Sequence, residues 1–285
     1  MASPTLNHGN KPVAVVVGAT SKWQADGRGT RLALGGRVDE SGVPVGVRWG
    51  VGGAVAQRFA NAGMFTVLTT RTRANASELA HAIDAQGGES LIVELDLTQR
   101  ASIANAFAEI REKAGVPEVL VYNAGYLEGR DLPAGQELLE YIPADMFETA
   151  VDLAIRGPFL VAKEVLPGMR GRGSGSFFFS NNMFSLRGRK RQTGESVYYP
   201  RVLMRTLSQV LTEEYSEHGV HVANVIIDGY IDSPGTRELK AAKENPSILI
   251  DPTQIAEAMY YLHTQERSCW THEIQLTPSV SKPSY

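Results

Sequence analysis

The sequence has few of the features that mark a secreted, membrane-spanning or nucleic-acid-binding protein. A single cysteine, Cys269, among 285 residues excludes an internal disulfide, and apolar runs such as residues 13–17 are too short to span a bilayer. Residues 1–11 lack the apolar core of a signal peptide. The 28 basic and 31 acidic residues are interspersed, which gives no footprint for nucleic acid. We therefore expect a cytoplasmic protein with a small-molecule substrate and no membrane or nucleic-acid partner.

What the sequence does have is a regular alternation of short apolar runs and longer amphipathic segments. This order is typical of βαβ units on a parallel sheet, and strands that are apolar throughout are covered by helices on both faces. We predict strands near 13–18, 65–70, 91–96, 118–122, 175–180, 221–228 and 270–276, with helices between them. The predicted fold is one doubly wound, Rossmann-type α/β domain over residues 12–277, with flexible termini at 1–11 and 278–285.

A glycine-rich turn follows the first predicted strand, but it is interrupted. Joining Thr20 to Trp49 gives "VVVGAT" and then "WGVGGAVA", a strand, three glycines and a helix in the order that a dinucleotide pyrophosphate requires. Such turns also occur for packing alone. The inserted segment 21–48 is too short to be an independent domain. It is a surface loop without a role, a lid carrying Lys22, Arg28, Arg31 and Arg37 over the phosphates, or translated intron.

Several spaced motifs carry a resemblance to a known family. They are the split glycine turn, "LDLT" at 95–98, "YNAG" at 122–125, "RGPFLV" at 156–161 and "IIDGYIDSPGT" at 226–236. The chain resembles the short-chain dehydrogenase/reductases from Val13 to Leu276, apart from the insert. The runs "SLRG", "HVANVIIDG" and "RSCWTHEIQL" are similar to a divergent subgroup.

The resemblance implies a nicotinamide dinucleotide site. Asp96 matches the aspartate near the adenine ring, and Ser233 stands where the family has a threonine that contacts the carboxamide. The implied cofactor-binding residues are Gly18, Thr20, Gly50, Gly52, Asp96, Asn123, Gly125, Ile231 and Ser233. The second strand ends "LTTRTR", with Arg71 and Arg73 and no acid, which favours NADP(H) over NAD(H). The alternative is an ordinary basic surface turn.

The catalytic pattern departs from the family. There, a serine holds the carbonyl, a tyrosine transfers the proton and a lysine four residues later lowers the tyrosine pKa, but no Tyr-x-x-x-Lys occurs in this chain. Alignment without gaps places Arg201 at the lysine position and Val197 at the tyrosine position. Tyr198 stands three residues before Arg201, a same-face spacing on a helix. Arginine keeps the charge but does not give up a proton.

The serine position has more than one candidate, and a fourth family position has changed. Ser185 lies thirteen residues before Tyr198, the family's usual spacing, and Asn181 and Asn182 are alternative donors to a carbonyl. The helical asparagine that supports a proton relay in the family is replaced by Ala154. We take Tyr198, Arg201 and Ser185 as the candidate catalytic residues.

Two functions therefore remain open. The first is an NADP(H)-dependent oxidoreductase that reduces a carbonyl or oxidises an alcohol of a small organic molecule. The alternative is a catalytically degenerate NADP-binding protein that acts as a regulator or partner subunit. An S-adenosylmethionine site on the glycine turn is disfavoured by "YNAG", "LDLT" and "RTR". The resemblance also implies a homo-oligomer, dimer or tetramer, and a substrate loop at 235–251, whose residues do not reveal the substrate.

Overall fold

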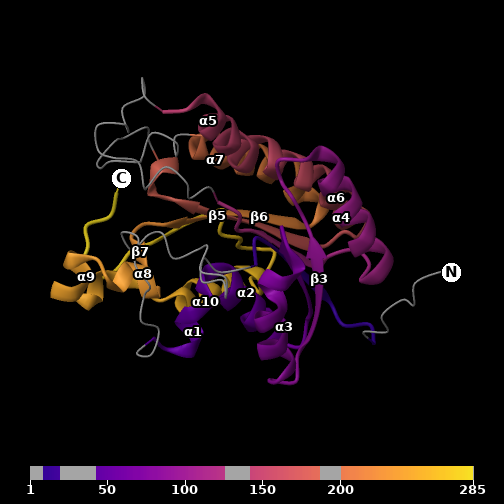
Figure 1. Ribbon diagram of the computed structural model, residues 1–285. Coiled ribbons are helices and arrows are strands. Elements are labelled where there is room, and N and C mark those ends of the chain that lie inside the picture. Colours follow the sequence, from indigo (N-terminus) through magenta and orange to yellow (C-terminus); the bar gives the residue numbers. More distant parts are fainter. Residues whose placement is uncertain (1–8, 20–42, 126–141, 187–199, 285) are drawn as a thin grey trace.

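The computed structural model describes residues 9–19, 43–125, 142–186 and 200–284 (Figure 1). Seven parallel strands form the central sheet in the order β3-β2-β1-β4-β5-β6-β9. They are β1 Val13–Val17, β2 Phe65–Thr70, β3 Glu89–Glu94, β4 Val119–Tyr122, β5 Gly175–Asn182, β6 Val220–Ile227 and β9 Glu273–Leu276. This strand order, which reverses direction between β1 and β4, confirms the predicted doubly wound fold.

Helices cover both faces of the sheet (Figure 1). They are α1 Val45–Arg48, α2 Gly50–Asn61, α3 Ser77–Asp84, α4 Arg100–Lys113, α5 Ala144–Val151, α6 Gly157–Arg172, α7 Arg201–Tyr215, α8 Pro234–Arg237, α9 Lys240–Glu244 and α10 Pro252–His263. One core contains residues of α4, α6 and α7, and the other contains residues of α2, α3 and α10. No helix in the described ranges is long and apolar enough to cross a membrane.

Strand β1 shows why the sheet forms. Its side chains point alternately to the two faces, as pleating requires, so that Val15 and Val17 enter the core beneath α4 and α6 while Ala14 and Val16 enter the core beneath α2 and α10. Both faces are apolar, so the strand is buried on both sides.

The strand register brings the carboxyl ends of the strands to one edge. Val17 is paired with Thr69 of β2 and with Tyr122 of β4, and Ile227 of β6 lies beside Asn182 and Leu276. Residues that directly follow the strands, among them Gly18, Arg71 and Asn123, therefore lie along this carboxyl edge. Ligands of doubly wound folds bind there, at the point where the strand order reverses.

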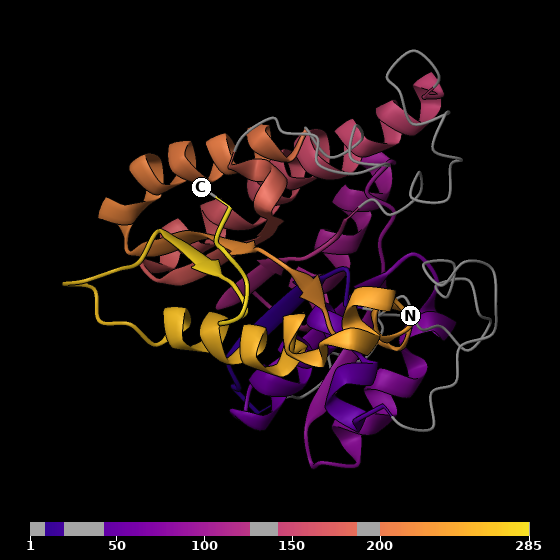
Figure 2. The ribbon, with the colours of Figure 1, turned by 90° about the vertical axis from the view of Figure 1, so that its left-hand side faces the viewer.

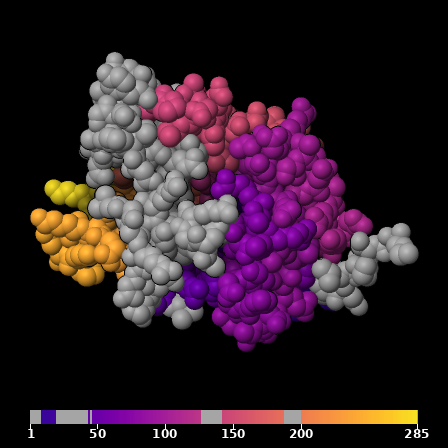
Figure 3. All heavy atoms as spheres, in the orientation of Figure 1, coloured from indigo at the N-terminus to yellow at the C-terminus, as the bar shows by residue number. Residues whose placement is uncertain are grey.

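The segment predicted as a substrate loop carries its own short elements. It contains α8, α9 and strand β8, Leu249–Ile250, which pairs with β7, Tyr230–Ile231. In the space-filling view these orange atoms form one corner of the molecule (Figure 3). This small second sheet continues from the carboxyl edge of β6.

Two predicted boundaries differ from the structure. Residues 43–48 were assigned to the insert, but α1 packs against α2 and α10, and Val47 is buried. Residues 278–285 were expected to be a flexible terminus, yet the Ser284 N–H donates to the Asp228 carboxylate over 2.7 Å. Long-range packing of these segments, which local composition does not reveal, accounts for both differences.

Candidate cofactor and active site

The glycine turn after β1 approaches the chain after β4 very closely. Gly18 has a φ of +80°, and a Cβ there would lie 2.9 Å from the backbone of Ala124. Gly50, with a φ of +64°, begins α2. A positive φ favours glycine, and the contact with Ala124 requires the absence of a side chain at Gly18.

Gly52 brings the first turn of α2 onto this loop. A Cβ at Gly52 would collide with the carbonyl oxygen of Gly18, and the Asn123 Nδ2 donates to that same oxygen over 3.0 Å. No side chain among the described residues caps the amino end of α2, whose first N–H groups have no partner within the helix. This glycine cradle beside a helix amino terminus fits the pyrophosphate of a dinucleotide.

The two arginines that follow β2, Arg71 and Arg73, differ in their contacts. Arg73 is held by Glu109 Oε1, 3.2 Å from its Nη2, and by the carbonyl of Ile92. Arg71 is exposed and forms no ion pair with another described residue. Both arginines were predicted to favour NADP(H); in the structure Arg73 is engaged by Glu109, whereas Arg71 is exposed.

Asp96 follows β3, and its carboxylate is bound to its own loop. The Asp96 Oδ1 accepts hydrogen bonds from the Thr98 N–H over 3.0 Å and from the Thr98 hydroxyl over 2.7 Å. The half-buried Asp96 therefore shapes the rim of the carboxyl edge. Thr20, the remaining predicted residue of the glycine turn, lies outside the described residues.

Arg201, the first residue of α7, lies between the ends of β4 and β5. Its Nη1 donates to the carbonyl of Ser180 over 3.1 Å, and its Nη2 packs so closely on Gly125 that a Cβ there would collide with it. The side chain of Asn181, in β5, also contacts Arg201: its Nδ2 donates to the Arg201 carbonyl over 3.3 Å. The cation predicted at the lysine position is therefore at the carboxyl edge, beside Gly125. Tyr198 lies outside the described residues.

Ser185 is not positioned to hold a substrate carbonyl. It is fully buried in the short 3-10 helix Met183–Ser185, and its hydroxyl donates to the Asn182 carbonyl over 2.7 Å. The catalytic assignment of Ser185 does not agree with this geometry, because the hydroxyl completes a turn. Asn182, the alternative, is half-buried at the end of β5.

A π-helical turn, Asp152–Arg156, occupies the place of the missing relay asparagine. It separates α5 from α6, and the Tyr122 hydroxyl donates to the Leu153 carbonyl within it over 2.7 Å. Burial raises the pKa of Tyr122 far above that of an ordinary phenol, and the smaller effect of the Arg201 charge lowers it. Tyr122 therefore stays protonated and serves as a donor. Only the motif "YNAG" marked this tyrosine in the sequence, and no role was predicted for it.

Ser233 and Ile231 lie in the turn after β6. The Ser233 hydroxyl accepts a hydrogen bond from the Thr236 N–H over 3.2 Å and so caps α8, while the Thr236 hydroxyl donates to the Ile231 carbonyl over 2.6 Å. Ser233 is buried and Ile231 half-buried. The structure thus fixes this turn at the carboxyl edge, but it gives the Ser233 hydroxyl a local partner.

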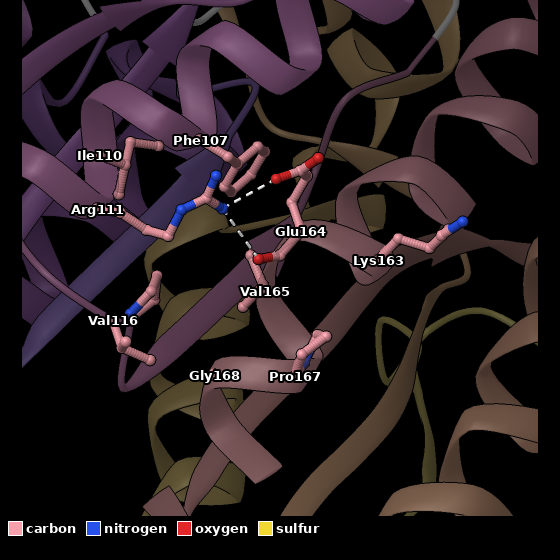
Figure 4. A pocket seen from close by; sticks show the side chains of 10 residues that line it. Phe107, Ile110, Arg111, Val116, Lys163, Glu164, Val165, Pro167 and Gly168 are labelled. Carbon is pink, nitrogen blue, oxygen red and sulfur yellow. Dashed lines mark hydrogen bonds and ion pairs between the residues drawn. The ribbon is translucent and has the colours of Figure 1, made fainter. Parts of the chain in front are cut away.

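A shallow hollow of about 280 Å³ lies elsewhere, between α4 and α6 (Figure 4). Its lining includes Val116 and Pro117, which precede β4, and an ion pair between Arg111 and Glu164 with an Nη1–Oε2 distance of 2.9 Å. It is therefore at the amino edge of the sheet, opposite the glycine cradle. In the described ranges, no cluster of histidine, cysteine or acidic side chains could hold a metal ion.

Comparison with known proteins decides the family. The model of the short chain dehydrogenase family matches residues 43–244, well over half of the chain. The chain belongs to the short-chain dehydrogenase family. This family consists of oxidoreductases. The resemblance to the short-chain dehydrogenase/reductases that was seen in the sequence is therefore confirmed. The divergent subgroup remains a prediction.

The relatives are distant. An uncharacterised oxidoreductase of Staphylococcus saprophyticus is 27% identical over 246 residues, which cover 84% of this chain and 97% of the relative. The cis-4-hydroxycyclohexanecarboxylate dehydrogenase of Sinomonas cyclohexanicum is 26% identical, with 79% and 90% covered. A metagenomic short-chain oxidoreductase solved in complex with NADP has a TM-score of 0.69 at 21% identity, with 94% and 98% covered. At this identity the structural match shows the fold alone.

Proposed function

We propose that this family member is an NADP(H)-dependent oxidoreductase that interconverts a carbonyl and an alcohol of a small organic molecule. The observation that carries the proposal is the position of Arg201, whose guanidinium lies on Gly125 and against the Ser180 carbonyl at the carboxyl edge. A cation has thus been retained at the lysine position of the family, next to the glycine cradle.

The cofactor would be held by the cradle. The pyrophosphate fits the N–H groups at the start of α2, where Gly18 and Gly52 allow close approach, and Arg71 would pair with the 2′-phosphate of the adenosine ribose. When bound, NADPH supplies the hydride for carbonyl reduction. An NADP-bound structure among the similar folds supports this choice of cofactor.

For carbonyl reduction, the protein must supply a proton donor and a hydrogen-bond donor to the substrate carbonyl. We assign the proton to Tyr198 and its electrostatic support to Arg201, because a nearby cation lowers the pKa of a phenol towards neutrality. The Asn182 amide, at the end of β5, would donate to the substrate carbonyl in place of Ser185. Without a lysine, Arg201 stabilises charge and does not relay the proton.

The alternative is a protein that binds NADP but has lost turnover. It is favoured by one observation: the π-helical turn carries Ala154 where the family has its relay asparagine, and the Leu153 carbonyl there is occupied by the Tyr122 hydroxyl. In this case Arg201 would serve only to hold the cofactor ribose. The protein would then act as a regulator or partner subunit.

Three further assignments complete the proposal. The protein is cytoplasmic, its substrate is recognised in part by residues 235–251, and it forms a homo-oligomer through α6 and α7. Exposed apolar side chains on these helices support the oligomer: Phe159 is 50% exposed, Leu203 52% and Val210 45%. Apolar side chains of this size are expected to be covered by another molecule when they are grouped.

Titration of the purified protein with NADPH and with NADH tests the proposal first. We expect NADPH to bind at least about tenfold more tightly than NADH, because only NADPH offers a 2′-phosphate to Arg71. A turnover screen with NADPH would begin with 4-oxocyclohexanecarboxylate, the ketone related to the substrate named for the Sinomonas relative. Tight NADPH binding without turnover would favour the degenerate protein, and equal binding of both dinucleotides would refute the NADP assignment.

A further inference from the structure

The chain that follows β9 turns back across the carboxyl edge of the sheet. We call residues 277–284 the strap. Pro278 lies against Gly229, where a Cβ would be 3.1 Å from the Pro278 Cδ, and the Ser284 Oγ lies 3.6 Å from the Met183 Sδ. The strap therefore leaves β9, passes the end of β6 and reaches the end of β5. Figure 2 shows the yellow chain turning back after β9 towards the end marked C.

One buried carboxylate holds the strap. Asp228 directly follows β6 and is only 4% exposed. Its Oδ2 accepts hydrogen bonds from the Ser284 N–H over 2.7 Å, from the Gln275 Nε2 over 2.7 Å and from the Thr277 hydroxyl over 3.4 Å. A carboxylate removed from water needs such donors, and two of the three come from the strap.

The far end of the strap is next to the proposed substrate site. Met183, which the Ser284 hydroxyl contacts, immediately follows Asn182, the residue assigned to hold the substrate carbonyl. On the other side of the strap, Gly229 leads into β7 and the segment 235–251. Figure 3 shows the yellow end of the chain beside the orange atoms of this region. The strap thus lies between the end of β5 and the predicted substrate loop.

We propose that the strap forms one wall of the substrate site and that Asp228 latches it in place. The proposal rests on the function proposed above, since it assumes a carbonyl substrate beside Asn182. A latched wall limits the space beside Asn182, so the intact protein favours compact carbonyl compounds over bulky ones. Release of the latch widens the site and leaves the glycine cradle, at the other end of the carboxyl edge, unchanged.

A matched pair of variants at one position tests the latch. Ser284→Pro removes the backbone N–H that Asp228 accepts, because proline has none, whereas Ser284→Ala keeps this N–H and loses only the hydroxyl. Asp228→Asn removes the charge from the acceptor, and Asp84→Asn, on the exposed end of α3, is its control. Hydrogen exchange of the strap amides is measured in all four full-length variants, together with NADPH affinity.

Turnover of a compact and a bulky ketone then tests whether the strap forms a wall of the substrate site. For each variant, kcat/KM with NADPH is measured for cyclohexanone and for the bicyclic ketone 2-decalone. We expect Ser284→Pro and Asp228→Asn to speed exchange of the strap by about tenfold or more and to raise the ratio of 2-decalone to cyclohexanone turnover by about tenfold. NADPH affinity stays within about twofold of the natural protein in all four variants, and Asp84→Asn leaves the strap exchange and the substrate ratio within about twofold as well. Ser284→Ala, which keeps the N–H, is expected to exchange more slowly than Ser284→Pro.

The outcomes separate the two proposals. Unchanged exchange in Ser284→Pro and Asp228→Asn would overturn the latch. Faster exchange with an unchanged substrate ratio would overturn the wall. If the natural protein binds NADPH but turns over neither ketone nor any compound of the screen, the oxidoreductase proposal fails, and the assignment of the strap to a substrate site falls with it, while the exchange data still decide the latch.

Discussion

The carboxyl edge of the sheet has two halves, one from β1 to β4 and one from β5 to β9, and they differ in how many of the family's motif residues they retain. From β1 to β4 the edge is built from close backbone approaches, such as Gly52 against the Gly18 carbonyl, and the family's residues are retained. From β5 to β9 the edge depends on side chains, and in this half Arg201 stands at the family's lysine position and Ala154 at the position of its relay asparagine. A cradle made of backbone tolerates no added atom, whereas a site made of side chains can exchange them. In the proposed function, the first half holds the cofactor and the second half carries the chemistry.

The largest effect is expected in the second half, from Arg201→Ala. Loss of the cation beside the proposed proton donor lowers kcat/KM by about 100-fold or more, while NADPH affinity, set by the first half, changes by about threefold or less. Steady-state kinetics and titration measure the two separately. Arg201→Lys retains the charge and is expected to keep more activity than Arg201→Ala. Arg172→Ala is the control, because Arg172 also donates to backbone carbonyls, those of Val116 and Pro117, but at the amino edge. Full activity of Arg201→Ala would remove Arg201 from the mechanism.

Gly52→Ala tests the first half. The new Cβ collides with the Gly18 carbonyl, so α2 must move away from the loop, and overpacking of this kind costs about 1–3 kcal/mol in stability. We expect NADPH affinity to fall by at least about tenfold as the N–H groups of α2 shift. Chemical denaturation and titration measure the two effects. Gly171→Ala, in α6 with open space around the position, should leave NADPH affinity unchanged and should not lower the stability, because alanine favours a helix over glycine. Unaltered NADPH binding by Gly52→Ala would place the dinucleotide elsewhere.

A smaller effect distinguishes the two arginines after β2. Arg71→Ala should weaken NADPH binding by about tenfold and leave NADH binding unchanged, because only the 2′-phosphate is lost as a partner. Arg73→Ala should affect NADPH less, since this side chain is already held by Glu109 and the Ile92 carbonyl. Equal losses in both variants would mean that Arg73 leaves Glu109 when the dinucleotide binds.

The sequence predicted what depends on local pattern. Apolar runs such as Val13–Val17 predicted the strands, and the glycines after β1 predicted a tight turn into α2, because periodicity and backbone freedom are local properties. It could not predict that Arg73 pairs with Glu109, 36 residues away, or that Ser284 returns to Asp228, 56 residues away. Ser185 was chosen by its spacing from Tyr198, but its burial depends on the packing of the turn after β5. The strands and the glycine turn were predicted well for this reason, whereas the roles of the residues on the carboxyl edge stay predictions.

The smallest effect is expected from a series of hydrogen-bonded side chains that leads from Glu273 to Arg201, in the half of the edge from β5 to β9. Arg205 binds Glu273 through two contacts of 2.7 Å, Asn224 donates to Glu273, and Asn181 links Asn224 to the Arg201 carbonyl. The hydrogen bonds from Arg205 lower the pKa of Glu273 below its ordinary 4.5, although burial acts in the opposite direction.

A group whose pKa is lowered in the folded state contributes stability above its unfolded pKa and loses it as the pH falls through the folded pKa. Glu273→Gln should therefore lower the free energy of unfolding by about 1 kcal/mol at neutral pH, a modest value because the pair is partly exposed. This difference from the natural protein should shrink as the pH falls below the ordinary glutamate pKa and vanish once the pH lies below the lowered pKa of Glu273 in the folded protein. Urea denaturation across this range measures it, with Glu244→Gln as the control, since Glu244 pairs with Lys240 on the exposed surface. If the difference persisted unchanged at low pH, the stabilisation would come from packing of the Glu273 side chain and not from its charge, and the chain of contacts to Arg201 would not respond to protonation.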